Sequence, residues 1–375
     1  MSRPKLLFLV TEDWFLHSHF LPLVRRALAE GYECVVAARN TGALKDVDGL
    51  RLIDMPFARG SMRPWDVGRQ VAQMRAIIAA ENPTLVHAIA LKPIALLAMA
   101  RVRDVARVFA VTGRGYLAVG RAPWTALLDW RLRRLLRREM RAPRTVLLVE
   151  NMADADWVAG AEPLASKHIV RIPGAGVDID IFTPAPEPSN GPFVVGLAAR
   201  LIYSKGVDIA VAAVQRLRHE GFDIVLRIAG DVDPQNPERV HEEKIAQWRC
   251  MEAVQMLGRV ADINAFWAGA HIACLPSRGG EGLPRSLLEA AAAGRAIVTT
   301  DVPGCADFVV HGETGLVVEG GAVPALVDAL RALATDAKSR VQMGLAGRKR
   351  VVEGFTERHA SDRASDAWRL ARNVS

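Results

Sequence analysis

The sequence has few cysteines, four among its 375 residues. They are scattered along the chain, at Cys34, Cys250, Cys274 and Cys305. None belongs to a Cys-x-x-Cys pair or stands at a metal-ligand spacing from a histidine, so neither a disulfide framework nor a structural zinc site is expected. This cysteine usage fits the reducing cytosol, and we expect a cytoplasmic protein.

The sequence also lacks a long apolar run. No stretch approaches the roughly 18 to 20 consecutive apolar residues of a membrane-spanning helix. The first apolar run, Leu6–Val10, is closely followed by Glu12 and Asp13. We therefore expect neither a transmembrane helix nor a secretion signal.

Two nucleotide-binding motifs are absent as well. A dinucleotide enzyme would carry Gly-x-Gly-x-x-Gly after its first strand, whereas Val10 is followed here by Thr-Glu-Asp-Trp. No Walker A sequence occurs. Aromatic residues make up 6% of the chain, with three tyrosines, and they form no basic-aromatic platform. A non-catalytic nucleic-acid-binding protein is therefore only a remote alternative.

What the sequence does contain is material for a large core. Half of the residues are apolar and 24% are charged, which excludes disorder and, at this length, suggests two globular domains. Residues 1–185 carry 26 Lys and Arg against 18 Asp and Glu, while residues 186–375 carry 22 against 23. This asymmetry indicates that the first half faces an anionic partner, such as phosphate, a membrane surface or nucleic acid.

Short apolar runs alternate with longer helical patterns in both halves, which is typical of a parallel sheet covered by helices on both faces. The predicted strands are Leu6–Val10, Cys34–Ala38, Leu85–His87, Val105–Val111, Thr145–Val149, Phe193–Leu197, Ile224–Ala229, Val254–Leu257, His271–Leu275 and Ala296–Thr300. We expect an α/β fold with two Rossmann-like doubly wound domains, residues 1–175 and 176–355, facing each other across a cleft. Four prolines in residues 183–192 predict a linker.

The most informative segment is RGGEGLPRSLLEAAAAGRAI, residues 278–297. Glu281 lies in its glycine-rich loop, and Glu289 follows eight residues later in a predicted helix that begins near Pro284. The free amide groups at a helix start can bind an anion, and glycines let a ligand approach the backbone closely. From the residues alone, two carboxylates reaching one ligand and two solvated carboxylates both remain open.

Residues 281–318 (EGLPRSLLEAAAAGRAIVTTDVPGCADFVVHGETGLVV) resemble the E-x7-E region of the retaining glycosyltransferases of family 4, which have the GT-B fold. GLAARLIYSKGVDIAVAA (Gly196–Ala213) is similar to the family's strand, Arg, loop, Lys-Gly, helix motif, and IPGAGVDIDIFTP (Ile172–Pro184) resembles the segment joining its two domains. HAIALKPIALLAMA, VTGRGY and LLVENMADADWV resemble a bacterial branch that acts in surface-polysaccharide, lipopolysaccharide and lipid-linked-oligosaccharide assembly.

The resemblance implies that the second domain binds a nucleotide sugar and the first binds a lipid-diphosphate or glycan acceptor. Glu289 would hold the ribose hydroxyls, and Glu281 would hold hydroxyls of the transferred sugar. Arg200 and Lys205 would stabilise the charge that grows on the leaving diphosphate, which implies catalysis without a metal ion or a cofactor.

Further donor contacts follow from the same resemblance. The segment Gly282, Leu283, Pro284 and Arg285, at the helix start, would approach the diphosphate or the sugar oxygens. Gly258 and Arg259 resemble the loop that contacts the nucleobase. The resemblance implies retention of the anomeric configuration through an oxocarbenium-like species. UDP, linked to a hexose or N-acetylhexosamine, is the preferred donor by family frequency.

Candidate acceptor-side residues follow the predicted strands of the first half. The expected residues are His19, His87, Lys92, Gly113 and Tyr116. For each histidine, a packed or exposed position without a ligand is an open alternative. Many family members carry glycines after the first strand, where this chain has Glu12 and Asp13.

The stretch Trp124–Arg144 is basic and amphipathic. Leu128, Leu132, Leu135 and Leu136 fall on one helical face, opposite Arg131, Arg134, Arg137, Arg138 and Arg141. We expect this helix to contact an anionic membrane, placing the protein peripherally at the inner face of the plasma membrane. The alternative is that its apolar face packs on the sheet while the arginines are solvated. The last helix, about 356–375, resembles the family's helix that returns to the first domain.

Other enzymes remain as alternatives. A metal-dependent glycosyltransferase of the other major fold would need Asp-x-Asp, which occurs here at residues 46–48, 154–156, 178–180 and 231–233 and is too frequent to discriminate. A nucleotide-sugar epimerase or a glycogen-type synthase can share the two-domain fold, because fold alone does not determine function.

Overall fold

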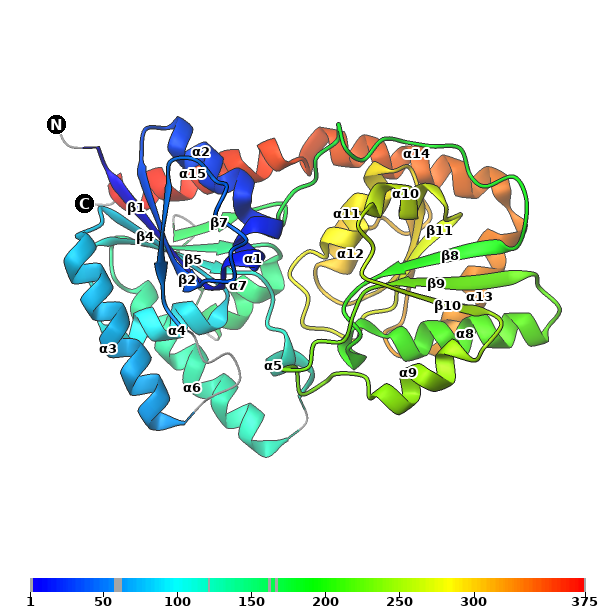
Figure 1. Cartoon of the computed structure of the whole chain (residues 1–375), viewed down its shortest axis with the longest axis horizontal. Helices are drawn as coiled ribbons and strands as arrows, with labels where there is room; N and C mark the ends of the chain where they lie inside the picture. The colour runs from blue at the N-terminus through cyan, green and yellow to red at the C-terminus, as the bar shows by residue number, and fades with distance from the viewer. Residues whose placement is uncertain (1–2, 57–62, 121, 161–162, 166–167, 374–375) are drawn as a thin grey trace. The chain divides into compact units, whose positions relative to one another are not determined.

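The computed structural model describes residues 3–56, 63–120, 122–160, 163–165 and 168–373. The chain forms two compact units, each built around its own sheet (Figure 1). The first unit consists of Met1–Ala175 and Glu357–Ser375, and the second of Gly176–Thr356.

The first unit contains a seven-stranded parallel sheet with the order β3-β2-β1-β4-β5-β6-β7. Its strands are β1 (Lys5–Glu12), β2 (Glu33–Arg39), β3 (Leu50–Asp54), β4 (Leu85–Ile89), β5 (Ala106–Val111), β6 (Thr145–Val149) and β7 (Ile169–Arg171). The central strands are apolar on both sides because helices cover both faces of the sheet.

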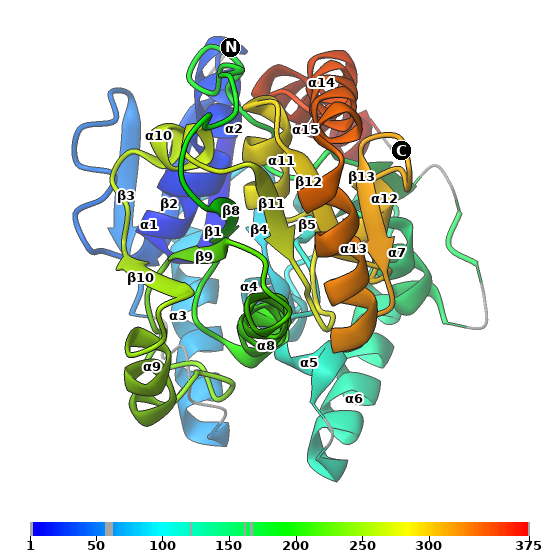
Figure 2. The same cartoon turned by 90° about the vertical axis from the view of Figure 1, so that its right-hand side faces the viewer.

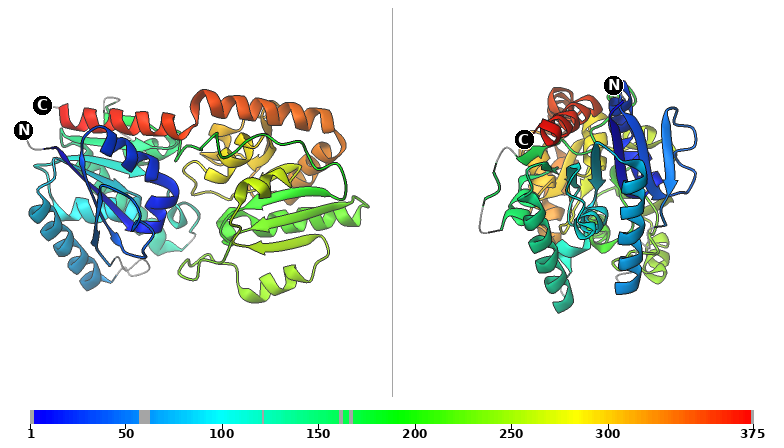
Figure 3. Two further views of the ribbon diagram at one scale, coloured as in Figure 1. Left: turned by 45° about the horizontal axis from the view of Figure 1, so that its top comes forward. Right: turned by 90° about the vertical axis from the view of Figure 1, so that its left-hand side faces the viewer.

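Helices of the first unit form two layers. They are α1 (Asp13–Phe15), a π-helical turn (Leu16–Phe20), α2 (Leu21–Ala29), α3 (Pro64–Glu81), α4 (Leu91–Ala100), α5 (Tyr116–Val119), α6 (Pro123–Met140), α7 (Met152–Ala159) and α15 (Glu357–Asn373). α2 and α15 pack on one face, while α3, α4, α6 and α7 pack on the other (Figure 3). The end of the expected C-terminal helix, residues 374 and 375, lies outside the described residues.

The second unit contains a six-stranded parallel sheet with the order β10-β9-β8-β11-β12-β13. Its strands are β8 (Phe193–Ala198), β9 (Ile224–Ala229), β10 (Val254–Gly258), β11 (Ile272–Leu275), β12 (Ala296–Thr300) and β13 (Gly315–Val318). The strand order reverses direction between β8 and β11, and in doubly wound sheets ligands bind at the carboxyl ends of strands beside such a point.

Helices also cover both faces of the second sheet (Figure 2). They are α8 (Val207–His219), α9 (Glu242–Arg249), α10 (Ile263–Ala268), α11 (Arg285–Ala292), α12 (Cys305–Phe308), α13 (Val323–Thr335) and α14 (Ala337–Gly354). α8, α9 and α13 share one core, and α10, α11 and α12 share another.

The two parallel sheets confirm the predicted fold class, with every predicted strand present. The structure adds β3, β7 and β13, which lie at sheet edges. The proline-rich segment 183–192 lies inside the second unit instead of joining the two units. Arg295 donates a hydrogen bond to the carbonyl of Ala185 and Arg340 pairs with Glu187, so this segment is attached to its own unit.

Candidate functional site

Two loops at the carboxyl edge of the second sheet bring a cation and a carboxylate together. Lys205 ends the loop after β8, in a 3-10 turn (Tyr203–Lys205), and Glu281 lies in the loop after β11. Lys205 Nζ donates a 2.7 Å hydrogen bond to Glu281 Oε2. Ser277 Oγ lies 2.8 Å from the other carboxylate oxygen, Oε1. The strand order explains why Lys205 and Glu281 are in contact, because their loops leave neighbouring strands, β8 and β11.

The same two loops approach each other through their backbones. Gly206 has a φ of 68°, and a Cβ atom placed there would lie 1.9 Å from the carbonyl oxygen of Pro276. Only glycine fits at this point. Ser277 is held further by Thr300, whose hydroxyl donates a 2.6 Å hydrogen bond to the Ser277 carbonyl. The segment that leads to Glu281 is therefore held by the loop after β8 and by the end of β12.

Arg200 lies at the end of β8 but pairs with a residue that the sequence did not single out as a site residue. Its guanidinium donates a 2.8 Å hydrogen bond to Asp233, in the loop after β9. The Arg200 side chain is 46% exposed, whereas that of Asp233 is 12% exposed. Arg200 is thus accessible to a ligand and is held at the strand edge by a carboxylate.

Glu289 lies in the second turn of α11 and is buried. Burial raises the pKa of its carboxyl above the ordinary value, although the nearby Arg285 guanidinium acts in the opposite direction. Arg285 Nε lies 2.9 Å from Glu289 Oε1. Gly282, Leu283 and Pro284 precede the helix and are buried, so their loop is a fixed part of the site.

Other charged residues surround this loop and were missed by sequence reasoning. Arg278 makes two hydrogen bonds to the Asp208 carboxylate, of 2.7 Å and 2.8 Å. Glu238 lies near Arg278 and Arg200, and burial raises its pKa. The pair of Arg278 and Asp208 joins the loop after β11 to the first turn of α8, and no spacing along the sequence signals it.

Gly258 is the last residue of β10, and Arg259 follows it. Gly258 has a φ of 62°, and its carbonyl accepts a 2.7 Å hydrogen bond from the amide of Gly230 after β9. Arg259 is exposed. Both residues therefore lie at the same carboxyl edge of the second sheet as Lys205, because β9 and β10 follow β8 in the parallel sheet.

Four of the expected acceptor-side residues lie at the carboxyl edge of the first sheet. His19 lies in the π-helical turn after β1, Lys92 in the first turn of α4 after β4, and Gly113 and Tyr116 follow β5. The pKa of Lys92 is lowered by burial, with Asp66 opposing the shift. Parallel strands end at one edge, so these positions share that edge.

The position of His87 differs from the acceptor-side position that was expected from the sequence. It is fully buried on β4, and its Nδ1 accepts a 3.1 Å hydrogen bond from the indole of Trp368 on α15. Burial lowers the pKa of His87 to about 3. Strand residues on this face point into the packed core, so His87 is a neutral packing residue.

Glu12 and Asp13, at the end of β1, support neighbouring backbone. The Asp13 carboxylate accepts hydrogen bonds from the amides of Thr41, at 2.7 Å, and Ala43, at 3.1 Å. Burial alone would raise the Asp13 pKa, but a hydrogen bond from the Thr41 hydroxyl, together with these amides, holds it below the ordinary value. Arg39 donates a 2.8 Å hydrogen bond to Glu12. Asp13 therefore orders the residues that follow β2, and Glu12 binds the last residue of β2.

The basic amphipathic stretch forms α6. Part of its apolar side packs on the core of the first unit, which is the alternative given above. Leu132 and Leu136 are buried in the core of the first unit, while Arg131 and Arg138 are exposed. The helix also exposes large apolar side chains in its first half, at Trp124, Leu127 and Trp130. Core packing thus accounts for Leu132 and Leu136 but leaves an exposed aromatic and basic face.

Within the described ranges, no group of three His, Cys, Asp or Glu side chains is placed to hold a metal ion. No helix in that part of the chain is both long and apolar enough to cross a membrane.

Two family descriptions match the chain, one for each unit. "Glycosyl transferases group 1" matches residues 192–336, and "Glycosyl transferase 4-like" matches residues 5–138. The first match contains Arg200, Lys205, Glu281 and Glu289.

The chain is also similar in sequence to individual glycosyltransferases. The chain is 32% identical, over 298 residues, to a GDP-mannose-dependent alpha-(1-6)-phosphatidylinositol monomannoside mannosyltransferase of Mycobacterium tuberculosis, covering 74% of this chain and 73% of that protein. It is 28% identical to the capsular polysaccharide biosynthesis glycosyltransferase CapM of Staphylococcus aureus, a match that covers 44% of this chain and 43% of CapM.

The fold is shared with Anabaena Alr3699/HepE, solved in complex with UDP, at a TM-score of 0.73 and 16% identity over 97% of this chain and 98% of that one. A mycobacterial relative this similar along most of both chains, together with the two family matches, shows that the chain belongs to the group 1 glycosyltransferases, with the GT-B fold.

Proposed function

We propose that this transferase binds a nucleotide sugar at the carboxyl edge of the second sheet and transfers the sugar with retention and without a metal ion. The contact between Lys205 and Glu281, at 2.7 Å, carries the proposal. It joins a cation suited to a diphosphate and a carboxylate suited to sugar hydroxyls, so the sugar–phosphate bond of the donor would lie beside the pair. Ser277 holds the carboxylate in place.

In this proposal the protein stabilises the leaving group by positive charge. Arg200 and Lys205 face the charge that grows on the diphosphate as the sugar–phosphate bond breaks. The amides at the start of α11 add partial positive charge at the same place. A phosphate oxygen of the donor would take the proton of the acceptor hydroxyl, and no enzymic nucleophile is needed.

Glu289 is proposed to bind the ribose. A carboxylate can accept hydrogen bonds from both hydroxyls of a vicinal diol, and charge-assisted bonds of this kind are worth roughly 1.5 to 3 kcal/mol each. UDP is the proposed nucleotide, and GDP is the alternative because the mycobacterial relative is described as GDP-mannose-dependent. Gly258 and Arg259 would contact the base.

Thermal unfolding tests the donor site. UDP, or GDP, should raise the melting temperature with EDTA present, because binding to the folded protein alone stabilises it. Glu289→Ala should abolish the shift, whereas Glu243→Ala, an exposed acid on α9, should leave it unchanged. Stabilisation by no nucleoside diphosphate would contradict the donor site, and stabilisation only with magnesium would contradict metal independence.

The proposed acceptor is a lipid-linked or glycan molecule of cell-surface polysaccharide biosynthesis, bound by the first unit. His19, Lys92, Gly113 and Tyr116 at the strand edge are its candidate contacts. The mycobacterial and staphylococcal relatives, named for a phosphatidylinositol mannoside and a capsular polysaccharide, support this class. Transfer to a lipid-linked primer favours this acceptor, while transfer only to a linear glucan would favour the glycogen-type alternative.

We also propose peripheral contact of α6 with the cytoplasmic face of a membrane. Trp124 and Trp130 are 56% and 51% exposed, and amphipathic aromatic side chains favour the membrane interface. Binding to vesicles containing phosphatidylglycerol should weaken in Trp124→Ser/Leu127→Ser. A matched change of two exposed apolar residues in the second unit, Val341→Ser/Leu345→Ser, should have no effect; equal binding by both variants would contradict the contact.

A further inference from the structure

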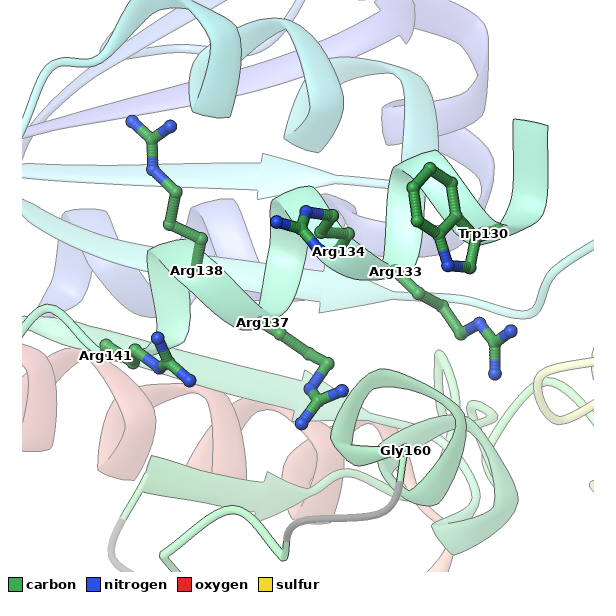
Figure 4. A pocket seen from close by; sticks show the side chains of 7 residues that line it. All are labelled: Trp130, Arg133, Arg134, Arg137, Arg138, Arg141 and Gly160. Atoms are coloured by element: carbon green, nitrogen blue, oxygen red, sulfur yellow. The ribbon is translucent and has the colours of Figure 1, made fainter. Parts of the chain in front are cut away.

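A pocket of about 480 Å³ lies beside the second half of α6. Its lining consists of one tryptophan, one glycine and five arginines: Trp130, Arg133, Arg134, Arg137, Arg138, Arg141 and Gly160 (Figure 4). All except Gly160, which follows α7, come from α6 or the residue after it. A hollow lined by so many guanidinium groups is suited to an anion with several negative charges.

The pocket is separate from the candidate acceptor residues. α6 leads from β5 to the parallel strand β6, so it runs back from the carboxyl edge to the amino edge of the sheet. α7 likewise ends at Ala159, directly before Gly160, and the chain then continues to the start of β7. Arg137, Arg141 and Gly160 therefore lie toward the amino edge, whereas Lys92 and Gly113 lie at the carboxyl edge.

The arginines of the pocket recur at the spacing of helical turns. Arg133, Arg137 and Arg141 follow at intervals of four residues, and Arg134 and Arg138 form another such pair. Like charges at this spacing lie side by side on a helix and destabilise it. Leu132 and Leu136 are buried on the opposite side, which fixes the direction in which the arginines point. Asp129 pairs with Arg133 and Glu139 lies 3.7 Å from Arg138, so a bound anion would add countercharge to a face that already carries some.

The core beneath the pocket keeps α6 in place. Glu139, on the buried side of the helix, accepts hydrogen bonds of 2.7 Å from Arg107 and 2.9 Å from Arg103. Arg107 is itself buried, at 1% exposure, and reaches Thr145 at 2.7 Å. This network attaches the helix to β5 and β6, so the arginine face does not depend on the helix's surface contacts.

Some guanidinium groups are also positioned individually. Arg133 Nε lies 3.2 Å from Asp129, which also accepts a 2.8 Å hydrogen bond from the indole of Trp157 on α7. The Arg134 guanidinium lies 5.8 Å from the centre of the Trp130 ring. A Cβ atom at Gly160 would lie 3.2 Å from Arg137 Nη1, so glycine leaves room for the guanidinium that points toward it in Figure 4.

We propose that this pocket binds adjacent phosphate groups, as found in a diphosphate or in clustered phospholipid headgroups. Planar guanidinium groups make paired hydrogen bonds to phosphate oxygens, and a row of them along one helix matches a ligand with more than one phosphate. The inference goes beyond the proposed function, because it concerns a second anion site and requires neither donor binding nor transfer.

Inorganic pyrophosphate is the first probe, measured by calorimetry at constant ionic strength. Arg200→Gln/Lys205→Gln is introduced into every protein, so that the cations of the second unit cannot contribute. Adding Arg137→Gln/Arg141→Gln should weaken pyrophosphate binding at least tenfold. Adding Arg25→Gln/Arg131→Gln removes the same charge from exposed residues outside the pocket and should change binding less than twofold.

Two results would overturn the site: equal weakening in both pairs of variants, which indicates general charge attraction, or no binding of pyrophosphate before these changes. Vesicles containing phosphatidic acid then distinguish the sources of phosphate. Loss of vesicle binding in Arg137→Gln/Arg141→Gln, with competition by pyrophosphate, supports a headgroup in the pocket. Unchanged vesicle binding beside lost pyrophosphate binding supports a soluble phosphate ligand.

Discussion

Lys205 and Glu281 form a 2.7 Å ion pair between the loops that leave β8 and β11. Their side chains are 18% and 9% exposed, so the pair is only partly screened by solvent. Each residue modifies the charge that a bound diphosphate would meet.

The first prediction is that these two partners have opposite effects on nucleotide binding. Lys205→Ala removes a cation and should weaken UDP binding about tenfold or more, since charge-assisted hydrogen bonds are worth roughly 1.5 to 3 kcal/mol. Glu281→Gln leaves Lys205 without its countercharge and should maintain or tighten UDP binding while it slows sugar transfer. Calorimetry with UDP checks both variants, and equal weakening in the two would contradict the assigned roles.

Arg200 should affect the chemical step more than Glu281 does. Removing a charged group that stabilises the leaving diphosphate should lower kcat by about 10²-fold, and Arg200→Ala should therefore be slower than Glu281→Gln. Arg216→Ala is the control, because Arg216 is an exposed cation on α8 whose 3.2 Å partner is Glu220. Wild-type kinetics in Arg200→Ala would remove Arg200 from the site.

Glu289 should contribute mainly to donor affinity. Glu289→Ala removes the proposed bonds to the ribose and should weaken binding of the nucleotide sugar by roughly 2 to 4 kcal/mol. A 2′-deoxy analogue of the nucleotide offers a second measurement, because it should lose affinity for the wild type but not for the variant. If the variant binds the intact nucleotide as tightly as the wild type, the ribose role is wrong.

Donor affinity should also depend on pH through Glu289. Burial raises its pKa, so this carboxyl takes up a proton at a higher pH than an ordinary glutamate. The protonated form loses its charge-assisted bonds, and affinity should therefore fall as the pH is lowered. A nucleotide sugar whose two phosphates are both esterified does not titrate in this range and is the suitable ligand. Calorimetry of Glu289→Gln should show a flatter pH profile than the wild type.

Much of the fold could be predicted because the central strands are apolar on both faces. Every residue from Leu6 to Val10 is buried, and that continuous run is visible in the sequence. β3 reads LRLID, has two charged residues among its five and lies at a sheet edge with no residue fully buried, so it gave no comparable signal. The same holds for the three-residue strand β7, of which only Val170 is buried.

The candidate donor-side residues could be proposed from the sequence because their motif is local, but the residues that they pair with in the fold could not. Arg200 pairs with Asp233 and Arg278 with Asp208, and each pair joins segments brought together only by the order of the strands. The glycine at 206 is explained by the carbonyl of Pro276, which also lies in a distant loop. Sequence spacing carries no information about such approaches.

The surroundings of His87 could not be predicted from the sequence either. Its environment depends on Trp368, 281 residues further along the chain, whose indole donates to His87 Nδ1. Burial lowers the pKa of His87 from 6.5 to about 3, so between these values the unfolded chain binds a proton that the folded chain does not. The stability contributed by neutral His87 is therefore present above pH 6.5 and is lost as the pH falls toward 3.

Within that window the free energy of unfolding should fall by up to about 1.4 kcal/mol per pH unit on account of this histidine. His87→Gln keeps an acceptor for Trp368 but cannot titrate, so its stability should decline less on acidification than that of the wild type. His219→Gln, which changes an exposed histidine at the end of α8, should follow the wild type. Urea unfolding at two pH values measures the difference, and parallel losses in all three proteins would show that His87 is accessible to protons in the folded state.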